Sequence, residues 1–214
     1  MKKISIIIMA IFCLLEIGKA QTQIGLKVAY STGLDRSSML SLDNGNDQYV
    51  YNFRYTGQSN VMSVGIATRK KLGTFFFAQE MSYRKTSYNF EIRDLSIIDP
   101  SKIISTSQAD HNFMIPLAMG FNLGNVSFAA GPIFNYKIKC QRSTDLDRIF
   151  RVQDEKLTTA FQFILGFNVN KHITLDIKYE HALGGVTDGY YFNNEKVKFK
   201  TRPDIITLGL SYFL

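Results

Sequence analysis

The side chains best suited to acid–base chemistry are two histidines. His111 and His181 fall near the ends of two strand-like runs, and Glu180 directly precedes His181. A nucleophile–base–orienter set would need a serine within hydrogen-bond reach of the imidazole. Neighbouring residues of an extended run point to opposite faces, so Glu180 and His181 make a poor pair. The sequence therefore predicts that the protein is not an enzyme.

Metal and cofactor sites are not indicated by the sequence. Asp145 and Asp147 supply too few oxygens for a calcium site. The chain has no zinc-ligand spacing, no phosphate-binding loop and no dinucleotide fingerprint. We therefore expect neither a bound metal nor a cofactor.

A second set of side chains is charged and shares one face of the strand-like runs. An eight-stranded barrel has an interior just wide enough for side chains to fill. Charges placed there are costly when isolated and tolerable when paired and hydrogen-bonded. We interpret the set as a structural interior polar network, with a proton or ion path as the alternative. Its members are Lys27, Glu80, Arg84, Lys137, Asp176, Lys178 and Glu180.

Four basic residues recur at every second position ahead of the last strand-like run: Lys196, Lys198, Lys200 and Arg202. Such a face could hold lipopolysaccharide phosphates or another anionic partner by charge. A solvated strand face is the alternative, and it is the interpretation that the pattern favours.

Strands must position these groups, because the dominant pattern is the alternation of apolar residues with small or polar ones. This period-two alternation recurs about eight times. Each run approaches the roughly 9–11 residues with which a tilted strand crosses a bilayer. The runs are Ile24–Tyr30, Met62–Ala67, Phe75–Arg84, Phe113–Asn122, Ser127–Lys137, Ala160–Val169, Ile173–Glu180 and Ile206–Leu214.

The connections between the runs alternate between short and long. Short turns at one end and long loops at the other are typical of outer-membrane barrels. The short connections are Lys70–Gly73, Leu123–Gly124 and Asn170–His172, and the long ones are Gly33–Gln58, Lys85–Asp110, Lys139–Lys156 and Leu183–Asp204.

The first long segment carries aromatic residues at alternate positions, namely Tyr49, Tyr51, Phe53 and Tyr55. We interpret them as a strand extension beyond the barrel rim, with an aromatic binding surface as the alternative. Thr56-Gly57 would then shift the register.

The N-terminus resembles a secretory signal peptide. Lys2 and Lys3 precede the apolar core Ile4–Leu15, and Ala20 ends a small-residue cleavage site. The predicted domains are a signal peptide over residues 1–20 and a barrel over residues 21–214. One cysteine, Cys140, would remain, which excludes a disulfide framework. The net charge of +7 is too dispersed to indicate a nucleic-acid partner.

The last run, Ile206–Leu214, contains no charged residue. An open sheet edge in lipid would leave backbone groups unsatisfied, so we expect this run to pair with Ile24–Tyr30 and close a ring. The predicted fold is an all-β, eight-stranded, antiparallel up-and-down transmembrane β-barrel, monomeric in the bacterial outer membrane. A soluble lipocalin-like barrel, with Phe75 and Leu165 facing inward, is the alternative.

A two-residue turn at Leu123-Gly124 would set Pro116 opposite Gly131. Because proline lacks a backbone donor for the ladder, we expect a bend or bulge at this pair.

The chain resembles the PorT-like small outer-membrane β-barrel proteins, whose barrels share the architecture of OmpX and OmpA. The similarity covers nearly the whole chain after residue 20, although such barrels usually end on phenylalanine and this chain ends on Leu214. The resemblance implies an outer-membrane location and allows a part in protein secretion. It is carried by Ile115–Phe121, Ala129–Tyr136, Leu175–Val186, Leu208–Leu214 and Glu80.

These observations predict a non-enzymatic binding or envelope-structural role through four external loops. An accessory part in a secretion assembly is the second hypothesis, and a lipid-modifying enzyme is the third. The predicted partners are outer-membrane lipid and lipopolysaccharide, with envelope or secretion proteins as further candidates.

Overall fold

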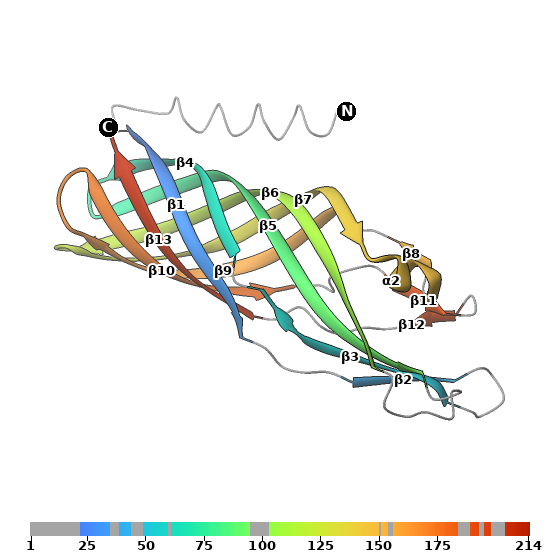
Figure 1. Ribbon diagram of the computed structural model, residues 1–214. Coiled ribbons are helices and arrows are strands. Elements are labelled where there is room, and N and C mark those ends of the chain that lie inside the picture. The colour runs from blue at the N-terminus through green and yellow to red at the C-terminus, as the bar shows by residue number, and fades with distance from the viewer. Residues whose placement is uncertain are drawn as a thin grey trace.

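The alternating runs form eight antiparallel strands that close into a barrel in this computed structural model (Figure 1). Each ring strand pairs with its neighbour along the chain, and the last pairs with the first. This confirms the predicted fold class. The ring consists of β1 (Thr22–Leu34), β4 (Val61–Leu72), β5 (Phe75–Asp94), β6 (Ile103–Leu123), β7 (Val126–Arg142), β9 (Leu157–Asn168), β10 (Ile173–Ala182) and β13 (Asp204–Phe213).

The structure describes residues 22–34, 39–43, 49–59, 61–94, 103–149, 151–153, 156–183, 189–192, 195–197 and 204–214. The predicted signal peptide, residues 1–20, lies outside these residues and stays a prediction.

Among the described helices, none has the length and apolar character needed to span a membrane.

The seam between β1 and β13 runs from the pair Gly25↔Phe213 to the pair Leu34↔Asp204. Beyond it, the Leu214 amide donates to the Ile24 carbonyl at 2.9 Å. The turn before β10 also holds this end of the seam, because the Phe213 amide donates to the His172 carbonyl at 2.6 Å. The predicted pairing of the last strand with the first is therefore confirmed.

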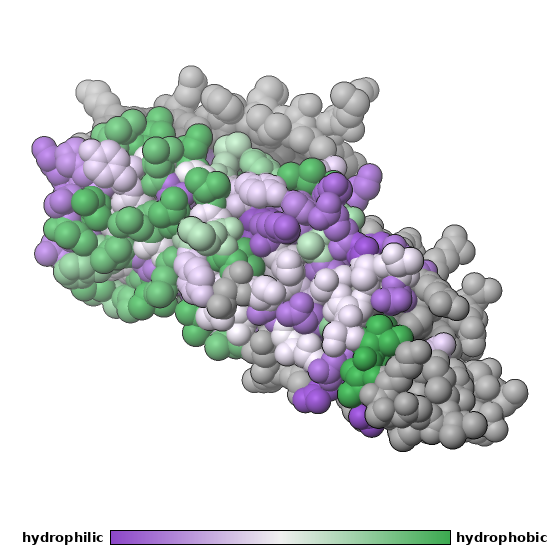
Figure 2. Space-filling view, in the orientation of Figure 1, coloured by the Kyte–Doolittle hydropathy of each residue, from purple (hydrophilic) through white to green (hydrophobic). Residues whose placement is uncertain are grey.

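The outer face of the ring is apolar and the inner face is polar. Leu26 is 67% exposed and Met62 is 74% exposed, whereas Lys27 is buried. Hydrophobic side chains gather over the end of the barrel with the tight turns (Figure 2). Phe75 and Leu165 also lie on the exposed side, which excludes the soluble lipocalin-like alternative. A closed ring with an apolar outside and a polar inside is a membrane-spanning barrel of the outer-membrane kind.

The segment predicted as the second long loop is largely strand. β5 and β6 are 20 and 21 residues long and remain paired from Phe75↔Phe121 to Arg93↔Ile103. Both strands extend beyond their neighbours at the loop end of the barrel (Figure 1). The prediction of a loop over the whole of Lys85–Asp110 is therefore wrong, because both strands continue with alternating faces through polar residues beyond the apolar band.

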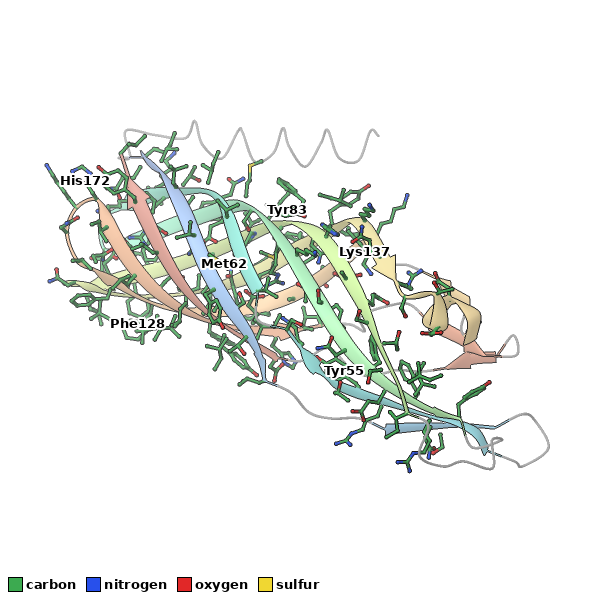
Figure 3. All side chains as sticks on the ribbon, in the orientation of Figure 1. Tyr55, Met62, Tyr83, Phe128, Lys137 and His172 are labelled. Carbon is green, nitrogen blue, oxygen red and sulfur yellow. The ribbon has the colours of Figure 1, made fainter. Side chains whose placement is uncertain are left out.

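Two further strands widen this projecting wall. β3 (Tyr49–Gln58) pairs with the distal part of β5, and β2 (Met39–Asp43) pairs with β3. The register shifts between Tyr55 and Gly57, where the glycine takes a φ of 146°. The aromatic residues of β3 thus belong to a strand extension, as predicted. Figure 3 places Tyr55 on the loop side of the barrel, away from His172 at the turn end.

A small separate sheet lies at the loop end. It contains β8 (Arg151–Gln153), β11 (Gly189–Phe192) and β12 (Glu195–Val197), with β11 in the middle. The short helix α2 (Thr144–Ile149) precedes β8.

The turn between β6 and β7 differs from the prediction. It is formed by Gly124-Asn125, because Gly124 takes the left-handed conformation with a φ of 63°. The register therefore moves by two residues, and Pro116 pairs with Ile133 instead of Gly131. The register shift between β6 and β7 lies between His111 and Asn112, and the register is the same on both sides of Pro116, where a bend or bulge was predicted.

The lipid-facing band generates a stability prediction. Leu210→Arg is expected to lower the free energy of unfolding by about 2–4 kcal/mol, because Leu210 lies between Val28 and Leu175 inside the apolar band. Leu72→Arg, at the exposed turn-side rim, is the control and should cost about 0–1 kcal/mol. Urea unfolding in lipid vesicles, followed by the gel mobility of boiled and unboiled samples, measures both. Equal costs would contradict the membrane placement.

Candidate functional site

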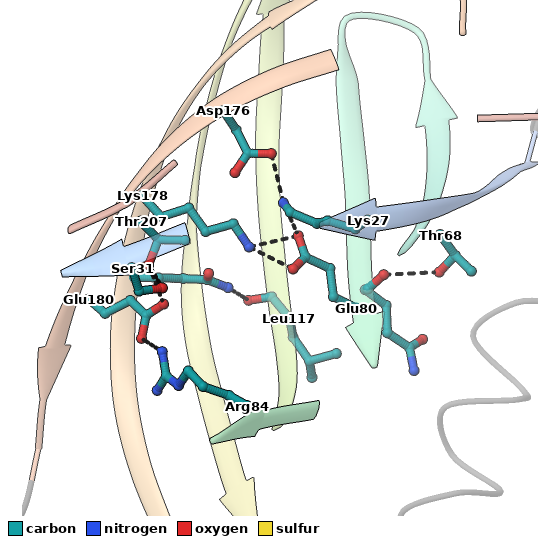
Figure 4. A network of polar contacts seen from close by, with 12 residues as sticks. Lys27, Ser31, Thr68, Glu80, Arg84, Leu117, Asp176, Lys178, Glu180 and Thr207 are labelled. Atoms are coloured by element: carbon teal, nitrogen blue, oxygen red, sulfur yellow. Dashed lines mark hydrogen bonds and ion pairs between the residues drawn. The ribbon is translucent and has the colours of Figure 1, made fainter. Parts of the chain in front are cut away.

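Four charged side chains meet across the interior of the barrel. Lys27 Nζ lies 2.9 Å from Glu80 Oε1 and 2.7 Å from Asp176 Oδ2. Lys178 Nζ donates to both oxygens of Glu80, at 2.8 and 2.6 Å. Two cations and two anions from β1, β5 and β10 thus form one neutral cluster (Figure 4).

A second interior group lies beside this cluster. Arg84 donates to Glu180 Oε2 at 2.8 Å, and Thr207 donates to Glu180 Oε1 at 3.2 Å. Ser31 is hydrogen-bonded to Thr207 at 2.8 Å, so the group links β5, β10, β13 and β1. Figure 4 shows it next to the four-charge cluster.

The remaining predicted interior charge is Lys137, whose Nζ lies 2.9 Å from Asp110 Oδ2. Asp110 was missed by the sequence analysis because it was assigned to a loop. Its position on β6, at the same parity as the buried Gln108, is the signal that could have found it. All seven charges predicted for the interior therefore lie in ion pairs.

Side chains fill the interior between and below the charges. Met114, Ile133 and Ala160 form a buried apolar cluster, and Gln162 donates to the Leu117 carbonyl at 3.2 Å. Near the turn end, the guanidinium of Arg69 lies 4.8 Å from the ring centre of Phe76 and 5.3 Å from that of Phe213.

Small polar cavities remain inside the barrel. Two have volumes of about 30 Å³ each, one beside Arg84 and Glu180 and one beside Lys27 and Asp176. A water molecule needs roughly 10–15 Å³, so these spaces suit a few waters. The interior therefore has the properties of a filled polar core and little room for a larger substrate.

A different arrangement lies on the outward face at the loop end. His181 Nδ1 is 2.8 Å from Asp204 Oδ1, and the Tyr179 hydroxyl donates to Asp204 Oδ2 at 2.8 Å. The His181 side chain is 56% exposed and that of Asp204 is 24% exposed. The last residues of β10 and the first residue of β13 bring the three together.

This geometry fits the orientation of a general base. If His181 donates its Nδ1 proton to Asp204, its Nε2 keeps a lone pair and can accept a proton. Water is a nucleophile that a histidine oriented in this way can activate. Asp204, and not the predicted neighbour Glu180, is the orienting carboxylate. Glu180 points into the barrel and binds Arg84.

Within the described part of the chain, the second histidine has no such orienter. His111 Nδ1 lies 2.5 Å from the Tyr83 hydroxyl, and its Nε2 lies 3.4 Å from Gln141 Oε1. Neither partner is a carboxylate, so His111 serves as a natural comparison for His181.

The four basic residues predicted as an anion-binding face fall largely outside the described residues. Lys196 lies in β12, but its side chain is not described, and Lys198, Lys200 and Arg202 are outside the described ranges. Their role stays a prediction.

No family model matches the chain, and no curated protein matches it. Among solved structures, the chain is similar to the outer membrane protease OmpT from Escherichia coli, with a TM-score of 0.42 and 10% sequence identity. The match covers 93% of this chain and 99% of that one. The PorT-like resemblance gains no support from these comparisons.

The functional predictions are corrected at this point, because the solved structure to which the chain is similar is that of a protease. This finding conflicts with the predicted non-enzymatic binding or envelope role and with the prediction that the protein is not an enzyme, and neither is retained. A match at this TM-score carries no information on the reaction or substrate of this chain.

The interior cluster generates the second prediction. Glu80→Gln should lower the free energy of unfolding by about 3–5 kcal/mol, because it leaves Lys27 and Lys178 without their shared buried carboxylate. Glu91→Gln is the matched control, since its pair with Arg54 is 4.0 Å long and exposed, and it should cost about 0–1 kcal/mol. Urea unfolding in vesicles measures both. An unchanged free energy of unfolding in Glu80→Gln would show that the cluster does not stabilise the barrel.

Proposed function

We propose that the protein is an outer-membrane hydrolase that cleaves an ester bond of a membrane lipid, with His181 as the general base. The contact between His181 and Asp204 carries this proposal. It lies on the lipid-facing side of the barrel, at the loop-side rim, where lipid head groups meet the apolar band.

The reaction needs water and the lipid alone. Nε2 of His181 accepts a proton from water as the water oxygen attacks the ester carbonyl. The tetrahedral adduct then breaks its bond to the leaving alkoxide, which takes the same proton from the imidazolium. A fatty acid and an alcohol are released. Asp204 positions the ring and stabilises the imidazolium, and Tyr179 holds the second oxygen of Asp204.

We expect a phosphate-bearing lipid as substrate. The basic residues Lys196, Lys198, Lys200 and Arg202, predicted to hold an anionic partner, come shortly before Asp204 in the sequence. This extends the predicted partnership with outer-membrane lipid and lipopolysaccharide. Export through a signal peptide cleaved after Ala20 is part of the same proposal, and the mass of the mature protein tests it.

The test uses the full-length mature barrel in vesicles of phosphatidylethanolamine and purified lipopolysaccharide, with fatty-acid release followed by mass spectrometry. His181→Ala should lower kcat by about 10²–10⁴-fold, the usual contribution of a general base. Asp204→Asn should lower kcat with little change in KM, because it disturbs the orientation of the base and leaves lipid binding intact.

His111→Ala is the control, because His111 lies on the outward face and its partners among the described residues, Tyr83 and Gln141, are not carboxylates. It should retain activity. Lack of fatty-acid release by the wild type, or equal activity of wild type and His181→Ala, would refute the hydrolase. Unchanged gel mobility of unboiled samples shows that each variant is folded.

A further inference from the structure

An apolar groove crosses the outer face of the barrel over β6, β7, β9 and β10. Its volume is about 460 Å³, within the range of roughly 300–1,000 Å³ that ligand sites occupy. The side chains that define it are those of Met119, Phe121, Phe128, Ala130, Phe163 and Tyr179.

The hollow follows from one small residue among large ones. Ala130 pairs with Met119 on one side and with Phe163 on the other, so a methyl group lies between two bulky side chains. Toward the turns, Phe121 and Phe128 stack with ring centres 5.5 Å apart. The floor of the groove is therefore at Ala130, and its walls are aromatic.

The other end of the groove reaches the rim site. Tyr179 pairs with Phe163 and lines the groove, while its hydroxyl donates to Asp204. Asp204 in turn contacts His181. One side chain thus joins the apolar groove to the proposed general base.

We propose that this groove binds one acyl chain of the lipid whose ester His181 attacks. The inference rests on the proposed function and specifies how the substrate is held. The occupant is a lipid chain because the groove is continuous with the lipid-facing band, whose exposed residues include Met119, Phe163 and Leu165. The lipid head group then lies at the rim, beside Tyr179 and His181, and the chain extends toward Phe128.

Tryptophan fluorescence can test the groove, because the chain contains no tryptophan. Phe163→Trp places a reporter in the groove. Val64→Trp places one on β4, which is 59% exposed at this position and pairs with none of the four groove strands. The probe is phosphatidylethanolamine with brominated acyl chains, mixed at low mole fraction into vesicles that carry the barrel.

The groove reporter should be quenched beyond the fraction expected for random lipid contact, whereas the β4 reporter should follow that fraction. Ala130→Phe, which fills the floor, should remove the excess quenching and raise KM for fatty-acid release. Leu165→Trp, also on the groove, is the second reporter if Phe163→Trp does not fold.

The outcomes separate the two proposals. If both reporters are quenched only in proportion to the mole fraction of brominated lipid, the groove does not bind an acyl chain, even if fatty acid is released. Excess quenching that Ala130→Phe removes, together with no fatty-acid release by any form, would keep the lipid site and refute the hydrolase. His181→Ala should leave the excess quenching unchanged.

Discussion

The pairing of buried charges across the barrel interior is the interaction on which the rest of the structure depends. A membrane barrel exposes apolar residues to lipid, so alternation sends polar residues inward. In so narrow an interior, each charge must find an opposite charge or destabilise the fold. Glu80 meets this requirement by binding Lys27 and Lys178 together, and Arg84 and Lys137 have their own carboxylates. The cluster joins strands that are far apart in the ring.

The small residues next to these ion pairs leave room for the charged side chains. A Cβ atom at Gly209 would lie 2.5 Å from Asp176 Oδ1, so the backbone of β13 leaves room for that carboxylate. A filled interior then restricts where chemistry with a large substrate can occur. The outward face and the rim remain available, and the pair of His181 and Asp204 lies there. A lipid substrate could therefore reach the pair of His181 and Asp204 from the membrane, without passing through the barrel.

The alternation predicted much of the fold because it is set by the membrane and repeated in every strand. It placed Lys27, Asp176 and Lys178 inside and identified the seam between the first and last strands. It could not determine the register between strands, because a turn can shift by one residue on each side without changing which residues face the lipid. Gly124 moved the β6–β7 register in this way.

Residues at strand ends were harder to assign than residues within the lipid band. Outside the bilayer, polar residues occur on both faces, so the pattern that marks a strand disappears while the strand continues. Asp110 and Asp204 were both treated as loop ends for this reason, although each is the carboxylate of a specific pair. The candidate site depends on such a residue, because Asp204 begins β13 while both of its partners, Tyr179 and His181, lie on β10. A long connection separates the two strands in the sequence.

Three consecutive residues of β10 combine a structural ion pair inside the barrel with the proposed site on its outer face. Glu180 turns inward and pairs with Arg84, while Tyr179 and His181 on either side of it turn outward and meet Asp204. The inward residue holds the strand in the ring, and this fixes the height and direction of its neighbours at the rim. A base on the outward face of a closed sheet is oriented by the strands that carry it and its partner. Ala130 and the groove then lie on the same rigid surface, so lipid chain and base would meet in a fixed relation.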